Sequence, residues 1–86
     1  MYYTYILKCA DKTLYTGITV DLNRRLNEHN NSDIGAKYTR CRRPVKLIYS
    51  KKFRSRSAAA KEENRIKKLT RQEKFELIKE KRKKIE

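Results

Sequence analysis

The sequence lacks any apolar run that approaches the ~20 residues needed to cross a bilayer. Its N-terminus also lacks the pattern of a secretory signal peptide. We therefore expect a cytoplasmic protein with no membrane partner. A chain of 86 residues has room for one modest core, so residues 1–86 are predicted to form a single domain.

Cysteine and histidine are scarce, with only Cys9, Cys41 and His29 in the chain. A structural zinc site needs four such ligands, usually as closely spaced pairs. Three isolated residues exclude a site of that kind. Both thiols are expected to be reduced and structural.

Acidic residues are also few: 24 Lys and Arg oppose 10 Asp and Glu, a net charge of +14. The stretch between Asp33 and Glu62 carries ten basic residues and no acid. Such a patch suits a polyanion, because each phosphate that it neutralises releases counterions. The alternative is a solvated surface that keeps a small protein soluble. A basic membrane-binding helix at the C-terminus would not explain why the patch begins so early.

The pattern of apolar residues predicts three strands, three helices and the order β-β-α-β-α-α. This is an α+β fold, a small and mostly antiparallel three-stranded sheet flanked by helices. Asp21 is expected to cap the first helix, and the T-x-x-E sequence at 70–73 to open a lysine-rich C-terminal helix at about 71–86. The predicted strands are 2–8, 13–18 and 45–50, and the predicted helices are 21–30, 57–69 and 71–86.

Gly17 lies within the second predicted strand. A glycine there indicates a bulge, or a place where another backbone or a ligand comes close. The first two strands are close in sequence and are expected to pair as an antiparallel hairpin.

Hydrolysis of a phosphodiester needs an activated water and neutralisation of charge at phosphorus. Tyrosine can accept the proton of water when cations depress its pKa, and arginine can clamp phosphate oxygens. The chain offers Tyr5 and Tyr15 on adjoining strands, with Arg25 and His29 one turn apart on the next helix. Paired strand tyrosines are, however, more often packing residues.

The order of these residues resembles the GIY-YIG nuclease superfamily, and most closely its compact stand-alone branch of small proteins (UPF0213-like). The resemblance covers residues 2 to about 78. It is carried by the runs Tyr3-Thr4-Tyr5, Tyr15-Thr16-Gly17, DLNRRLNEHN at 21–30, GAKYTR at 35–40 and RRPVKLIY at 42–49.

The resemblance implies a role for each matching residue. Tyr15 would act as general base on the attacking water, with Tyr5 assisting or orienting that water. Gly17 would leave the site unobstructed, and Arg25 would contact the scissile phosphate. His29 would be a phosphate or base partner, unless it is simply a satisfied, half-buried histidine.

The resemblance also implies that Glu63 is the single carboxylate that binds one divalent ion, Mg²⁺ or Mn²⁺. Helical geometry alone does not select it, because Glu62 falls near the same face at ~100° per residue. One carboxylate suits Mg²⁺, which keeps much of its hydration.

The predicted function is therefore a metal-dependent endonuclease of DNA processing or repair, with DNA favoured over RNA. The alternative is a non-catalytic nucleic-acid-binding module that kept the GIY-YIG fold. A basic adaptor for an acidic protein is a further alternative, and a partner protein could also target the nuclease. We expect a monomer in isolation, with pairing on DNA as a way to cut both strands. The predicted nucleic-acid contacts are Arg24, Lys37, Tyr38, Arg40, Arg42, Arg43 and Lys67.

Overall fold

The computed structural model describes residues 1–31 and 42–85, with side chains as far as Lys81. Its elements follow the order β-β-α-β-α-α, which confirms the predicted α+β fold. They are β1 (Tyr2–Lys8), β2 (Leu14–Thr19), α1 (Leu22–Asn31), β3 (Lys46–Phe53), α3 (Arg56–Lys67) and α4 (Arg71–Ile85).

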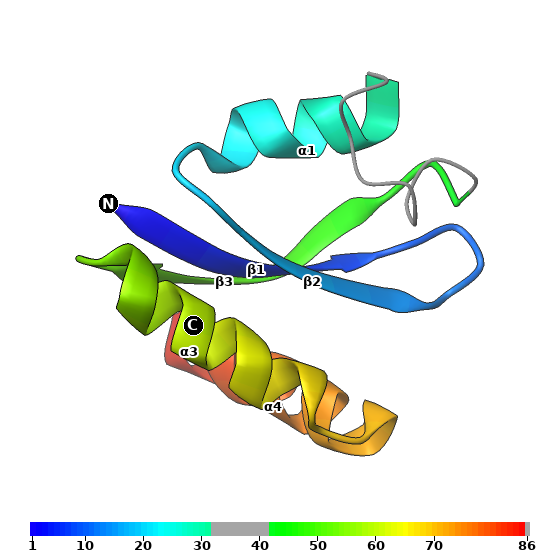
Figure 1. The fold of residues 1–86 in the computed structure, drawn as a ribbon. Helices are drawn as coiled ribbons and strands as arrows, with labels where there is room; N and C mark the ends of the chain where they lie inside the picture. Colours follow the sequence, from blue (N-terminus) through cyan, green and yellow to red (C-terminus); the bar gives the residue numbers. More distant parts are fainter. Residues whose placement is uncertain (32–41, 86) are drawn as a thin grey trace.

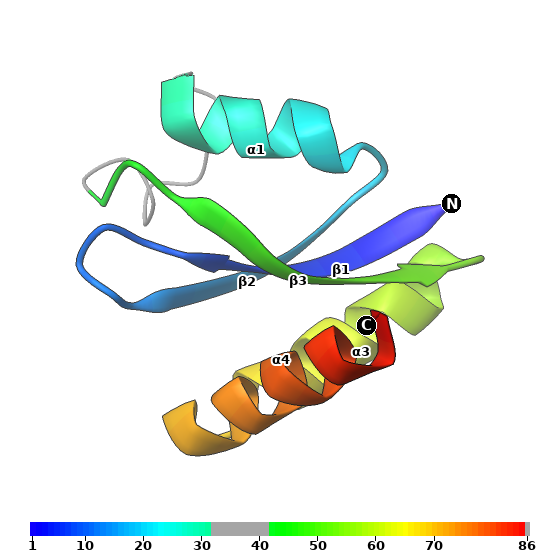
Figure 2. The same ribbon diagram turned by 180° about the vertical axis from the view of Figure 1, so that it is seen from behind.

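The sheet has the strand order β2-β1-β3, and β1 pairs antiparallel with both neighbours. Helix α1 covers one face of the sheet, whereas α3 and α4 lie together against the other (Figures 1 and 2). The sheet is therefore the middle of three layers. This arrangement leaves β2 and β3 as its two edges.

The central strand β1 is buried on both faces, since its side chains alternate between the two helical layers. Tyr5 and Leu7 pack toward α1 in a cluster with Cys9 and Val45. Ile6 packs on the opposite side with residues of α3 and α4. Thr4 also faces α3, and its hydroxyl donates a hydrogen bond of 2.8 Å to the carbonyl of Ala59. This bond satisfies a polar group that is fully buried.

Two predicted helix caps are confirmed. The Asp21 carboxylate accepts a hydrogen bond from the backbone N–H of Arg24 at 3.1 Å. Thr70 and Glu73 form a reciprocal capping box: the N–H of Thr70 donates to Glu73 at 2.9 Å, and the N–H of Glu73 donates to the Thr70 hydroxyl at 3.2 Å. Helix α3 begins earlier than predicted, because Ser55 caps it by accepting from the N–H of Ala58.

The prediction of a bulge at Gly17 is wrong. Gly17 pairs in regular register with Tyr5, and the φ angle of Gly17 is not positive. The irregularity of the sheet lies on the other side of β1, between Ile6 and Leu7, where the pairing with β3 shifts. Strand β3 also runs further than predicted, to Phe53. The group that comes close to Gly17 is the Tyr5 side chain, where a backbone or a ligand was expected.

Candidate active site

Tyr5 belongs to a group of three rings on the α1 side of the sheet. It is only 2% exposed, and its hydroxyl lies 2.9 Å from Nε2 of His29. Tyr15 completes the group, with its ring centroid 5.3 Å from that of His29 and 6.5 Å from that of Tyr5. Strands β1 and β2 and helix α1 each contribute one ring. The structure thus brings together three residues that are separate in the sequence.

Gly17 provides the space that the Tyr5 ring occupies. A Cβ built at Gly17 would lie 2.6 Å from the Tyr5 hydroxyl oxygen and 2.8 Å from its Cζ. It would also lie 3.3 Å from a ring carbon of Tyr15. Gly17 lies on the edge strand β2 and pairs directly with Tyr5 of β1. Because Gly17 has no side chain, the Tyr5 hydroxyl can extend over β2.

Burial raises the pKa of Tyr5 to about 12. A hydrogen bond from Arg25 and the charge of its guanidinium work in the opposite direction. The negative charges of Tyr15 and, to a lesser extent, of Glu63 in the opposite layer add to the increase. Tyr5 is consequently a phenol at neutral pH.

His29 is completely buried. Burial, reinforced by the positive charges of Arg25 and Arg43, lowers its pKa to about 4. The imidazole is therefore neutral at pH 7. It interacts with Tyr5 as a hydrogen-bonding group and carries no positive charge for a phosphate.

Arg43 and Asn30 fix the end of α1 that carries His29. The guanidinium of Arg43 donates 2.6 Å and 3.4 Å hydrogen bonds to the carbonyls of His29 and Glu28. The Asn30 side chain binds both backbone groups of Val45, accepting from its N–H at 2.7 Å and donating to its carbonyl at 3.1 Å. Sequence reasoning did not find either contact. No local spacing signals them, because the partners are 14 or 15 residues apart.

Glu62 and Glu63, which helical geometry alone left open, have different surroundings. Glu62 forms ion pairs with Lys51 and Arg65 and is half as exposed as its neighbour, 9% against 20% for the side chains. Its charge acts on Tyr49 of β3. The charge of Glu63 instead acts on Tyr5. Glu62 thus joins α3 to β3, whereas Glu63 is the one of the two whose charge acts on Tyr5.

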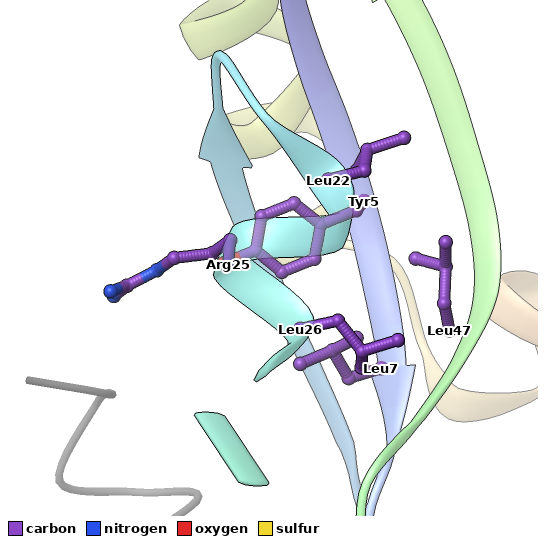
Figure 3. A pocket seen from close by; sticks show the side chains of 6 residues that line it. All are labelled: Tyr5, Leu7, Leu22, Arg25, Leu26 and Leu47. Carbon is purple, nitrogen blue, oxygen red and sulfur yellow. The ribbon is translucent and has the colours of Figure 1, made fainter. Parts of the chain in front are cut away.

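Arg25 borders an apolar pocket beneath α1 (Figure 3). Its guanidinium points away from the leucines, and Nη1 lies 3.0 Å from a carboxylate oxygen of Glu28. Glu28 also lies 3.5 Å from Arg24. Spacings of three and four residues on a helix could have identified Glu28 as their shared partner. The pocket is lined by Tyr5, Leu7, Leu22, Arg25, Leu26 and Leu47.

The predicted nucleic-acid contacts are spread over several surfaces. Arg24 is largely exposed, at 68% of its side chain. Arg42 pairs with Asp11 across 3.0 Å at the β1–β2 turn, and Lys67 lies 3.8 Å from Glu63. Arg43 holds α1, as described above. Lys37, Tyr38 and Arg40 lie outside the described residues, as does Cys41.

The described residues contain no group of three or more His, Cys, Asp or Glu side chains that could together hold a metal ion. Glu63 offers one partly accessible, hard oxygen donor whose charge acts on Tyr5. This donor suits Mg²⁺, which commonly binds one or two carboxylates and fills its remaining positions with water and phosphate oxygens. It does not suit a structural zinc site.

Residues 1–76 match the family model described as the GIY-YIG catalytic domain. The chain belongs to the GIY-YIG family. A UPF0213 protein of Syntrophus aciditrophicus is 55% identical over 78 residues, which are 91% of this chain and 90% of that protein. A UPF0213 protein of Streptococcus agalactiae, SAG0778, is 54% identical over 91% of this chain and 88% of its own length.

Two solution NMR structures have a similar fold. The UPF0213 protein BH0048 of Bacillus halodurans superposes with a TM-score of 0.59 at 42% identity, covering 92% of this chain and 84% of that one. The protein EF2693 of E. faecalis superposes with a TM-score of 0.60 at 49% identity, covering 88% and 81%. Membership of a catalytic-domain family supports a nuclease-type function. Within 1–31 and 42–85, no helix has the length and apolar character to span a membrane.

Proposed function

We propose that this protein is a metal-dependent endonuclease that hydrolyses a phosphodiester of DNA, in DNA processing or repair. The observation that carries the proposal is the convergence of Tyr5, Tyr15, Arg25 and His29 beside Gly17, with the charge of Glu63 acting on the Tyr5 hydroxyl. These groups match the chemical needs of the reaction, namely a base for water, a cation for phosphate and a carboxylate for a metal ion.

Tyr15 is proposed as the general base. It is half-buried whereas Tyr5 is almost completely buried, so Tyr15 is the tyrosine that water can reach. As a phenolate it would take a proton from the attacking water while the new P–O bond forms and the bond to the leaving oxygen breaks. Tyr5, a phenol at neutral pH, would orient that water or its neighbour, since its hydroxyl is held by His29.

Arg25 is proposed to bind the scissile phosphate. Its guanidinium points away from the apolar pocket and interacts with the Tyr5 hydroxyl. A guanidinium can donate two parallel hydrogen bonds to phosphate oxygens. Because Glu28 already holds one of its nitrogen atoms at 3.0 Å, Arg25 would approach the phosphate in a restricted set of orientations.

Glu63 is proposed to hold a single Mg²⁺ or Mn²⁺. When bound, such an ion supplies positive charge to the phosphate oxygens. In the free protein the carboxylate lies 3.8 Å from Lys67. The more than half-exposed ammonium of Lys67 would move aside at little cost, because an ion pair with an exposed partner contributes only about 0–1 kcal/mol.

The test uses a panel of labelled DNA and RNA substrates, single-stranded, duplex, flapped and branched, with Mg²⁺ or Mn²⁺ against EDTA. Wild type is compared with Glu63→Gln and Glu62→Gln, which remove the same charge from adjacent positions. We expect product that requires the metal, disappears in Glu63→Gln and persists in Glu62→Gln. Cleavage by Glu63→Gln at the wild-type rate would refute the metal assignment, and loss only in Glu62→Gln would transfer it to that residue.

A non-catalytic nucleic-acid-binding module is the second candidate. The near-complete burial of Tyr5 favours it. It predicts salt-dependent binding with no metal-stimulated product, and binding that is unchanged in Tyr15→Phe. A gel shift on the same reactions that shows binding without product would favour the binding module over the nuclease.

A further inference from the structure

A second cationic feature lies on the other face of the sheet, where the β1–β2 turn meets the start of α4 (Figure 1). An open pocket with about 300 Å³ of space, part of it solvent, is lined by Leu14, Arg71 and Lys74. Neither basic residue is among the predicted contacts. The pocket is therefore separate from the predicted nucleic-acid contacts.

The guanidinium of Arg71 is held in place by two contacts. Its Nη2 donates a 2.8 Å hydrogen bond to the carbonyl of Lys12, and its Cζ lies 5.2 Å from the centre of the Phe75 ring. A guanidinium has five N–H donors, so the bond to Lys12 leaves others for a ligand. Holding the group in advance reduces the entropy that binding would cost.

The charge of this pocket is not neutralised by the described part of the chain, where no carboxylate pairs with Arg71 or Lys74. The adjacent acid, Glu73, instead accepts from the N–H of Thr70. Other cations near the candidate active site do have acidic partners, including Arg25 with Glu28 and Lys67 with Glu63. Two unneutralised cations lining one pocket are suited to an anion.

We propose that Arg71 and Lys74 form a second phosphate subsite, which binds a backbone phosphate of the nucleic acid away from the scissile bond. The proposal rests on the proposed function only in taking nucleic acid as the ligand. Leu14 of this pocket and Tyr15 of the candidate active site are consecutive residues that face opposite sides of β2. Since β2 is an edge strand, a polynucleotide that passes along this edge could contact both sites. Phosphate contacts of this kind position a nucleic acid without reading its sequence.

The proposal is tested by measuring the affinity for a fluorescein-labelled DNA duplex at several salt concentrations by anisotropy, with EDTA present. Lys74→Gln is the main variant, because no described contact of Lys74 would be lost. Lys79→Gln is the matched control, an exposed lysine of the same helix with the same charge change. We expect the slope of log K against log[salt] to become shallower by about 0.9 in Lys74→Gln, the value for one phosphate contact, and to stay unchanged in Lys79→Gln.

Arg71→Gln should reduce the slope in the same way, provided that its melting temperature shows an intact fold. The same titrations are repeated with inorganic phosphate as the probe. A slope for Lys74→Gln equal to that of Lys79→Gln overturns the proposal. The proposal is also overturned if the substitution changes the binding of inorganic phosphate but leaves the salt slope of DNA binding unchanged, which would indicate a small-anion site. Because EDTA is present throughout, a protein that never cuts DNA can still pass this test, and its failure as a nuclease remains a separate result.

Discussion

The Tyr5 hydroxyl and Nε2 of His29 are 2.9 Å apart in a part of the protein that solvent scarcely reaches, with the two residues 2% and 0% exposed. Both groups are neutral at pH 7, because burial raises the pKa of the phenol to about 12 and lowers the pKa of the imidazole to about 4. The pair can therefore be buried without the desolvation cost of a charge.

His29 should make stability depend on pH in a window set by its own titration. The unfolded chain binds a proton near pH 6.5, whereas the folded chain does so only near pH 4. The contribution of His29 to the free energy of unfolding is therefore complete above pH 6.5. Up to about 3 kcal/mol of it is lost as the pH falls to 4. Urea unfolding at several pH values measures the loss.

His29→Gln is the matched control, because the chain has no other histidine. The difference in unfolding free energy between wild type and this variant should shrink as the pH falls below 6.5. NMR of the single imidazole gives an independent value. A ring that titrates at the pKa of a free histidine would contradict the buried, neutral state.

Gly17→Ala should displace the Tyr5 ring. The added Cβ would meet the hydroxyl oxygen at 2.6 Å and Cζ at 2.8 Å, so the ring must leave its contact with His29. Overpacking of this kind costs about 1–3 kcal/mol, and thermal melting should show the loss. The pKa of Tyr5, followed by ultraviolet titration, should fall from about 12. Ser50→Ala is the control, because Ser50 is the β3 partner of Tyr5 and already has a Cβ. This variant should change neither the melting temperature nor the pKa of Tyr5.

Arg43→Lys should loosen the end of α1. Lysine keeps the charge but cannot reproduce the two hydrogen bonds of the guanidinium to the carbonyls of His29 and Glu28. We expect a loss of about 2 kcal/mol in stability, together with a rise in the pKa of His29 as water reaches the ring. The exposed Lys46→Arg exchange serves as control. A shallower salt slope for DNA binding with an unchanged His29 would instead support the predicted phosphate contact.

Glu62→Gln should reduce stability and leave any catalytic activity in place. Its partners Lys51 and Arg65 are more than half exposed, so the loss should be about 1 kcal/mol. Neutral-pH thermal melting measures it. The loss should disappear at low pH, because the ion pairs lower the pKa of Glu62 and their contribution ends once the carboxyl is protonated. An equal loss at every pH would exclude the ion pairs as its cause.

The elements of the fold were predictable because their signals are local. β-branched and aromatic residues indicated the central strand, and the side chains of Asp21, Thr70 and Glu73 form the helix caps that their spacing indicates. The start of α3 was missed by one residue, because Ser55 and Ser57 are both acceptable at the start of a helix and the sequence alone does not decide between them.

The residues of the candidate site were predictable from the sequence, but their burial and their neighbours were not. Spacing placed Arg25 and His29 on one side of a helix, yet only tertiary packing buries His29 completely. Likewise, Glu62 and Glu63 are adjacent, and it is the packing of α3 against the sheet that gives them different neighbours. The hydrogen bond from Arg43 to the carbonyl of His29 joins two segments that no sequence periodicity relates.

The pairing of Tyr5 with Gly17 links assembly of the candidate site to the folding of a single hairpin. A slip of one residue between β1 and β2 would bring Thr16 or Ile18 opposite Tyr5, and either side chain would occupy the space that its ring needs. Such a slip would also turn Tyr15 to the wrong face of the sheet. A chain with the wrong register would therefore lack both a well-packed interior and the tyrosine pair, so misfolded molecules should also lack the candidate site.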